Sequence, residues 1–161
     1  MADREDFDVV ALLHELAATC RDGEAGFRQA AERIADPAVR KQLVVHAHRR
    51  AGLGAELIAE IQRLGGDPET TGHLAGALHR GWIGLKSALA GRGDAAVLAE
   101  VTRGEEFALQ EYTAACRKPL PPETRKVLVR QLQDVEAAAA EIGALRDRAG
   151  PPTDQEPRST S

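Results

Sequence analysis

Aromatic residues and cysteines are scarce in this chain of 161 residues: aromatic side chains make up 3%, and the only cysteines are Cys20 and Cys116. So few aromatics disfavour a β-sandwich or barrel, because strands are rich in such residues. The two cysteines lack the CxxC spacing of a redox or zinc motif, and a domain of this size does not need a disulfide. We therefore expect both to be buried thiols.

Membrane-spanning and phosphate-binding features are also missing. No apolar run approaches the roughly 18 residues of a membrane span, and the N-terminal MADREDFD is acidic where a secretory signal would be basic and apolar. Acids and bases alternate along a chain of net charge -4, which leaves no basic stripe for a nucleic-acid backbone. The sequence holds no glycine-rich phosphate loop or nucleophile elbow. These absences predict a cytoplasmic protein without a membrane span and without a nucleic-acid partner.

Apolar residues recur at alternating steps of three and four, the spacing of amphipathic helices. Strong stop signals separate the segments: Asp36-Pro37 suits a cap followed by a first turn, and Gly65-Gly66 suits a helix end. Asp94 is expected to cap the helix that it begins. The predicted helices cover residues 7–35, 37–64, 74–90, 94–117 and 122–148.

The lengths of the connections predict how these helices are arranged. Two connections are short, so the first two helices and the last two should form antiparallel hairpins. The helix over 74–90, about 25 Å long at about 1.5 Å per residue, would carry the chain back along the bundle. A long crossover between two hairpins is the ferritin-like connectivity. We predict an all-α domain over residues 1–149, an antiparallel ferritin-like four-helix bundle with an extra crossover helix, and a disordered tail over 150–161.

Polar residues on stripes that should be apolar are the functional clues in such a bundle, because an unpaired buried charge is costly. Glu24 lies in a column of apolar residues on the first helix, and Glu105 interrupts the stripe of the fourth. His46 and Arg50 lie on the second helix, and Gln131 lies on the last. All five are near the middle of their helices, so pairing of the hairpins would bring them to a similar depth.

One interpretation of these residues is a metal site. Bundles with two iron or manganese ions use one glutamate from each of two helices and a Glu-x-x-His motif from each of the other two. Glu24 and Glu105 supply the lone glutamates, but neither the second nor the last helix carries the motif. What remains is a mononuclear or weak iron or manganese site formed by Glu24, Glu105 and His46.

The alternative interpretation is a structural polar layer without a cofactor. Arg50, Arg49 or Tyr112 would then satisfy the inward carboxylates. The resulting polar layer, which also contains Gln131, would fix the register of the helices, a role that buried polar groups have in coiled coils. The incomplete ligand set favours this alternative.

Several stretches of the chain resemble an uncharacterised bacterial ferritin-like family of four-helix-bundle proteins, a domain of unknown function. The likeness extends from about Leu12 to Asp147, and GALHRGW is its most specific element. The resemblance implies the ferritin-like fold and metal binding but no particular reaction. The matching stretches are DGEAGFRQAAE, RLGGDPE, LAGALHRGWIGLKSAL, LAEVTRGEE and PLPPETRKVLVRQ.

The chain departs from that family at two positions. Family members often carry a cysteine where this chain has Val101 and a histidine where it has Ala139. The missing histidine removes the best nitrogen ligand on the last helix, so iron chemistry is not expected of this chain in particular. Positions that match the family pattern are Glu24, Glu100, Glu105 and Gln131.

The sequence thus supports two functional hypotheses. The first is a non-enzymatic helical protein with a structural polar layer and a stress-related role exerted through an unknown protein partner. The sequence leaves open whether this protein forms a homodimer. The second is a ferritin-like metal-binding protein or oxidase with an incomplete iron or manganese site.

Overall fold

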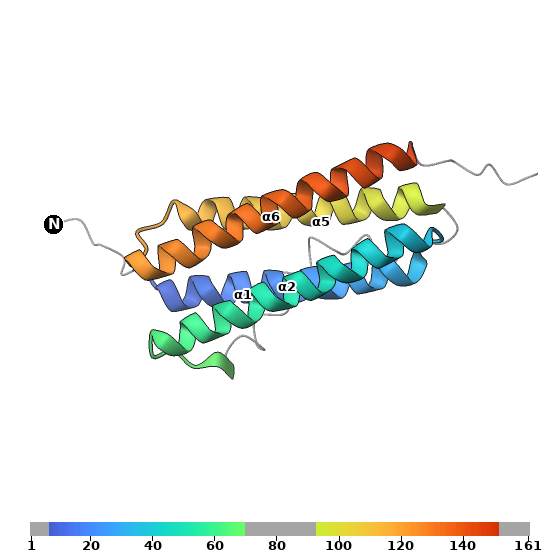
Figure 1. Ribbon diagram of the computed structural model, residues 1–161. Helices are drawn as coiled ribbons and strands as arrows, with labels where there is room; N and C mark the ends of the chain where they lie inside the picture. Colours follow the sequence, from blue (N-terminus) through green and yellow to red (C-terminus); the bar gives the residue numbers. More distant parts are fainter. Residues whose placement is uncertain (1–6, 70–92, 152–161) are drawn as a thin grey trace, which may run out of the picture.

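Four α-helices and no strand make up the described part of the protein, which is residues 7–69 and 93–151 of a computed structural model (Figure 1). This confirms the predicted all-α class. The predicted helix bounds differ from the observed ones by at most two residues, and the expected helix over 74–90 lies outside the described residues. The helices are α1 (Val9–Arg33), α2 (Pro37–Arg63), α5 (Gly93–Cys116) and α6 (Pro122–Ala149).

Aspartates begin the first two helices and glycines end the second. The Asp8 carboxylate accepts a hydrogen bond from the Ala11 amide at 3.0 Å, and that of Asp36 accepts one from the Ala38 amide at 2.8 Å. Each bond satisfies an amide that has no partner within its own helix. After α2, Gly65 takes a φ of +80°, a conformation that favours glycine. These local signals explain why the helix bounds were readable from the sequence.

Contacts at the helix ends show how the helices lie against one another. A Cβ atom on Gly66 would lie 2.7 Å from the Val10 side chain, so the end of α2 packs closely on the start of α1. Thr124 of α6 bonds to Glu60 of α2 at 2.6 Å, so α6 begins beside the end of α2. α1 packs along both α2 and α5, and α6 packs along α5, whereas α2 and α6 meet over a much shorter stretch (Figure 1).

Asp94 has a different role from the predicted one. Helix α5 begins at Gly93, and the Asp94 carboxylate accepts hydrogen bonds from the backbone amides of Ala35 at 2.8 Å and Asp36 at 3.1 Å. It therefore ties the start of α5 to the turn between α1 and α2. The sequence prediction missed this role because the partner amides lie far away in the chain.

Removing this tie should lower stability measurably. We expect Asp94→Ala to reduce the free energy of unfolding by about 1 kcal/mol, because two backbone amides lose their acceptor. Urea unfolding followed by circular dichroism measures the change. Asp147→Ala, which removes an exposed carboxylate of α6 that pairs with the neighbouring Arg146, is the matched control. An equal loss in both variants would contradict the assigned role.

The core consists of two apolar clusters separated along the bundle axis. One cluster includes Leu16, Leu57 and Leu128, and the other includes Ile34 and Ile142. On α2 and α5 the buried residues between the clusters include charged ones. That boundary contains Arg50 and Glu105, which are 2% and 0% exposed. The bundle thus encloses charged side chains at its centre.

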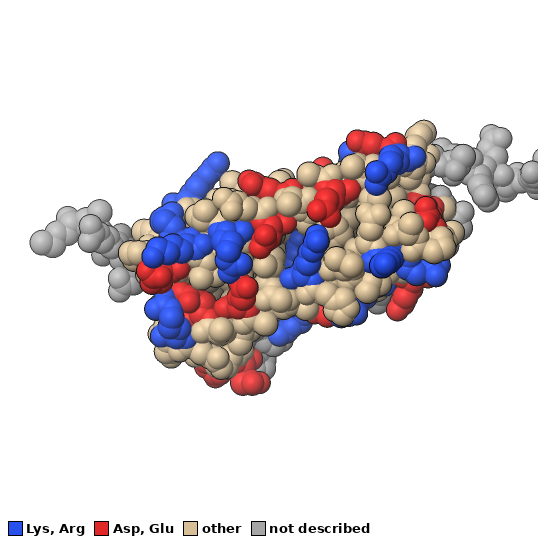
Figure 2. All heavy atoms as spheres, in the orientation of Figure 1, with Lys and Arg blue, Asp and Glu red and all other residues tan. Residues whose placement is uncertain are grey.

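The surface mixes charges of both signs. On the face that Figure 2 shows, Lys and Arg lie interspersed with Asp and Glu over the helices. Of the helices in residues 7–69 and 93–151, none combines the length and apolar composition needed to cross a membrane.

Candidate functional site: a polar layer at the centre of the bundle

An ion pair between Arg50 and Glu105 crosses the bundle centre from α2 to α5. Arg50 Nη2 donates to Glu105 Oε1 at 2.8 Å and to Oε2 at 2.7 Å. The side chains are only 3% and 1% exposed. Burial raises the pKa of the Glu105 carboxyl, and the neighbouring Arg50 guanidinium opposes that shift. Because a guanidinium stays protonated in proteins, Arg50 provides a permanent positive charge for this carboxylate.

Helix α1 provides the space and the apolar wall for the Arg50 side chain. A Cβ atom on Gly23 would lie 3.0 Å from Arg50 Nη1 and 3.1 Å from its Cγ, so glycine leaves room for the arginine. One turn further, the Phe27 ring centroid is 5.7 Å from Arg50 Cζ, within the range of a cation–π contact. Gly23 and Phe27 thus position the cation from the side opposite α6.

A second set of buried hydrogen bonds passes through all four helices in turn. Tyr112 of α5 donates its hydroxyl proton to Gln131 Oε1 of α6 at 2.8 Å. The Cys20 thiol of α1 lies 3.1 Å from the same hydroxyl oxygen and is therefore the donor in that bond. Gln131 Nε2 in turn donates to the Leu53 carbonyl of α2 at 3.2 Å and to Glu56 at 3.0 Å.

The part of this set of hydrogen bonds that contains Cys20 and Tyr112 is uncharged. Burial raises the pKa of the Cys20 thiol and that of the Tyr112 hydroxyl, so both keep their protons at neutral pH. A buried protonated thiol is a poor nucleophile. We define the polar layer as Cys20, Arg50, Glu105, Tyr112 and Gln131, and it links every described helix to at least one other.

His46 lies beside the polar layer and faces α6. Its Nε2 is 3.0 Å from Glu141 Oε2, and its ring stacks on Phe27 with the centroids 5.3 Å apart. Burial lowers the pKa of His46, while the carboxylate of Glu141 opposes that shift. A neutral imidazole that donates from Nε2 carries no proton on Nδ1.

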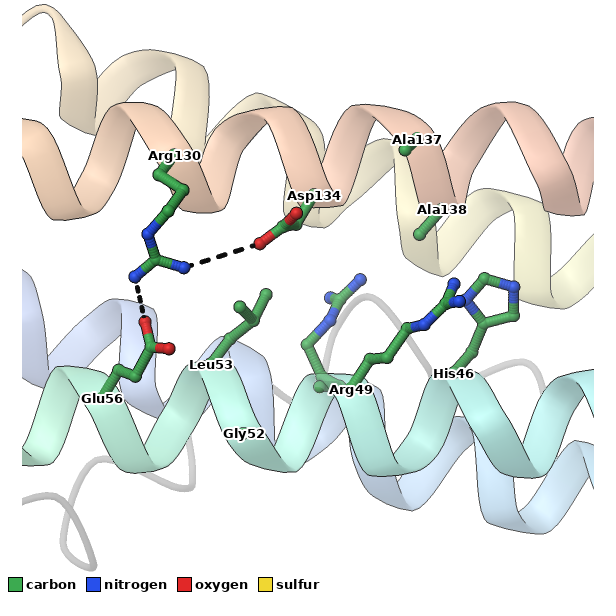
Figure 3. Close-up of a pocket in the computed structure, with 10 residues that line it drawn as sticks. His46, Arg49, Gly52, Leu53, Glu56, Arg130, Asp134, Ala137 and Ala138 are labelled. Carbon is green, nitrogen blue, oxygen red and sulfur yellow. Dashed lines mark hydrogen bonds and ion pairs between the residues drawn. The ribbon is translucent and has the colours of Figure 1, made fainter.

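A groove lies along the short α2 and α6 contact, and we name it the α2–α6 groove. It has a volume of about 480 Å³ and runs from His46 and Arg49, past Leu53 and Ala138, to Glu56 and Arg130. Figure 3 shows the His46 ring at one end and Arg130 at the other, where Arg130 pairs with both Glu56 and Asp134. The groove therefore opens beside the polar layer.

Comparison with protein-family models gives a match over most of the described helices. A model described as "Domain of unknown function (DUF2383)" covers residues 8–118, which is more than half of the chain. The chain belongs to the DUF2383 family. The matched range includes α1, α2 and α5 completely. Comparison of this DUF2383 protein with curated proteins found no match.

The predicted metal ligands do not gather in this DUF2383 protein. Glu24 is 30% exposed and accepts from Arg28 Nη2 at 2.9 Å, so its carboxylate lies at the edge of the bundle rather than beside Glu105. Both oxygens of Glu105 are held by Arg50, and His46 bonds to Glu141. In the described ranges no three side chains of His, Cys, Asp or Glu come together as a metal-binding group. The residues present therefore do not fit a metal site made of Glu24, Glu105 and His46.

The positions of Glu24 and Glu105 on their helices explain why the two carboxylates do not meet. Glu105 lies on the main apolar stripe of α5 and is buried, whereas Glu24 lies in the column beside the main stripe of α1. Four residues along α1, Arg28 reaches the Glu24 carboxylate, as side chains at this helical spacing do.

Sequence reasoning missed one member of the polar layer and two residues that support it. They are Cys20, which contacts Tyr112, and Gly23 and Phe27, which lie against Arg50. A signal was available: the three residues follow one another at steps of three and four, so they share one face. Their partners on other helices were not predictable from that spacing.

Glu60 makes a second polar contact between helices, near the C-terminal end of α2. It accepts from Arg63 at 2.5 Å and from the Thr124 hydroxyl at 2.6 Å, and hydrogen bonding from Arg63 is the main cause that lowers its pKa. A lowered pKa in the folded state means that the carboxylate stabilises the fold above its unfolded pKa of about 4.3. The contribution is then lost as the pH falls through the folded value.

This contact predicts a pH-dependent effect on stability. At pH 7 we expect Glu60→Gln to lower the free energy of unfolding by about 1 kcal/mol, and at acidic pH, below the folded pKa, we expect the difference from wild type to shrink. Urea unfolding at both pH values measures this. Glu32→Gln, at an exposed position of α1, is the control and should change stability by less than about 0.5 kcal/mol. A loss that stays constant with pH would contradict the role of the ionised Glu60.

Proposed function

We propose that this DUF2383 protein is a non-enzymatic, ferritin-like helical bundle in which a buried arginine takes the place that a metal ion has in related bundles. The observation that carries the proposal is the contact of Arg50 Nη2 with both oxygens of Glu105. In di-iron and di-manganese bundles, inward carboxylates are compensated by metal cations. Here the positive charge is built into α2.

The positions of the helix ends support the ferritin-like connectivity. α2 ends beside the start of α1, and α5 starts beside the turn after α1. The end of α2 and the start of α5 therefore lie at opposite ends of the bundle, as the ferritin-like connectivity requires. A crossover helix between α2 and α5 stays a prediction.

The remaining polar groups of the centre support a structural role. Cys20 and Tyr112 keep their protons, and Tyr112 and Gln131 use their hydrogen-bonding groups on other helices. Such a layer favours one alignment of the helices, because a shifted alignment would leave buried polar groups without partners. A stress-related role through a partner protein stays a prediction from the sequence.

Metal analysis tests the proposal. The full chain is purified without a chelating tag, and iron, manganese and zinc are quantified per chain before and after anaerobic addition of ferrous iron. We expect metal well below one ion per chain and no faster oxidation of ferrous iron than in buffer. One tightly held ion per chain that is lost in Glu105→Gln, but kept in the control Glu100→Gln on the same helix, would overturn the proposal.

A further inference from the structure

The α2–α6 groove has the size and the lining of a small-molecule site. Its volume of about 480 Å³ lies within the range of pockets that bind small ligands. Small residues line it on both helices, with Gly52 on α2 and Ala137 and Ala138 on α6, and Leu53 adds an apolar surface. The middle of the groove is therefore suited to an apolar group.

A buried polar atom at one end of the groove has no hydrogen-bond partner among the described residues. It is Nδ1 of His46, which lines the groove. Arg50 Nη1 is also unpaired, but it lies against Gly23 of α1. The His46 side chain is 2% exposed, so water does not readily satisfy its Nδ1 atom. Native proteins leave few buried polar atoms unpaired, and those that remain often mark functional sites. Neutral His46 offers an acceptor at Nδ1.

The positive charge available to a ligand is concentrated at the same end. Arg49 is 62% exposed and lies 3.5 Å from Glu141, a contact too long for a strong hydrogen bond, so its guanidinium can reach a ligand. At the other end Arg130 is already held by Glu56 and Asp134. Glu105 and Glu141 partly balance the charge of Arg49 and Arg50, which limits the site to a ligand of low negative charge.

We propose that the α2–α6 groove binds a small 2-hydroxycarboxylate with an apolar body. The carboxylate accepts hydrogen bonds from Arg49, since arginine donors match carboxylate oxygens in geometry. The hydroxyl donates to His46 Nδ1. The apolar body lies against Leu53 and Ala138. The hydroxyl supplies a donor to the unpaired His46 Nδ1 while the carboxylate binds Arg49, and a simple carboxylate lacks that donor.

A matched pair of ligands tests the proposal. Mandelate and phenylacetate share a ring and a carboxylate and differ by the hydroxyl, and each is titrated into the full chain by isothermal titration calorimetry with EDTA present. We expect saturable binding of both, with mandelate about tenfold tighter, because one hydrogen bond to a buried acceptor separates them. Absence of saturable mandelate binding, or equal affinity for the two ligands, would overturn the proposal.

Variants locate the site. His46→Phe keeps an aromatic ring against Phe27 and should abolish the preference for mandelate, and Arg49→Gln should weaken both ligands at least about fivefold. Ala137→Leu fills the groove from an exposed helix position and should remove binding without unfolding the protein, which circular dichroism verifies. Arg103→Gln on α5, which removes an exposed arginine paired with Glu100, is the control and should bind as wild type. Unchanged binding in both Ala137→Leu and Arg49→Gln would place the ligand elsewhere and overturn the assignment.

Discussion

Replacing Arg50 with methionine is expected to reduce the free energy of unfolding by about 3–5 kcal/mol, the largest loss from any single polar substitution considered for this protein. Methionine fills much of the space of the arginine stem but provides no charge. Glu105, whose side chain is 1% exposed, then has no cation beside it. It must either remain charged in an apolar environment or take up a proton, and both outcomes destabilise the fold at neutral pH.

The measurement is urea unfolding at pH 7, with the control Arg28→Met. Arg28 also pairs with a glutamate, but its side chain is 46% exposed, and we expect its loss to change stability by less than about 1 kcal/mol. The Arg50→Met variant should also lose less stability at acidic pH, because a protonated Glu105 no longer needs a cation. Equal losses in the two variants would mean that burial adds nothing to the Arg50 pair.

Replacing Tyr112 with phenylalanine is the substitution with the second largest expected effect, a loss of about 2 kcal/mol. The ring stays in place, so the packing of the apolar cluster that includes Leu16, Leu57 and Leu128 is kept. What disappears is the hydroxyl between Cys20 and Gln131, which leaves the Gln131 side-chain oxygen buried without its donor. An unsatisfied buried acceptor costs more than the hydrogen bond itself contributed.

Thermal and urea unfolding measure the effect of Tyr112→Phe. Thr113→Val, a substitution of similar chemistry at the neighbouring, partly exposed position of α5, is the control. It should leave stability within about 0.5 kcal/mol of wild type. If Tyr112→Phe is also that mild, the hydrogen bonds through the four helices do not hold the helices in place.

The helices could be read from the sequence because their signals are local. Asp36-Pro37 and Gly65-Gly66 mark helix ends within a few residues, and the apolar steps of three and four mark the inward faces. The same periodicity placed Glu105 and Arg50 on inward stripes, where the structure has them. Which partner each would meet depends on the axial position and rotation of other helices, and no local signal reports either quantity.

Glu24 shows the limit of that reasoning most clearly. A column beside the main stripe lies near the boundary of the buried face, so a small rotation of α1 decides whether its members face the core. Ala17 and Ala31 of this column are buried, whereas Glu24 turns toward Arg28 at the surface. An alanine fits either environment, but a carboxylate is far more stable next to a cation and water.

The coupling free energy between Arg50 and Glu105, from a double-mutant cycle, tests the central claim of a self-contained ion pair most directly. The cycle compares wild type, Arg50→Met, Glu105→Met and the double variant by urea unfolding at pH 7. Each single variant should lose several kcal/mol, and the double variant should recover to within about 1 kcal/mol of wild type, because no buried charge is left alone. Losses that simply add in the double variant would contradict the claim that each residue is held at the bundle centre by the other.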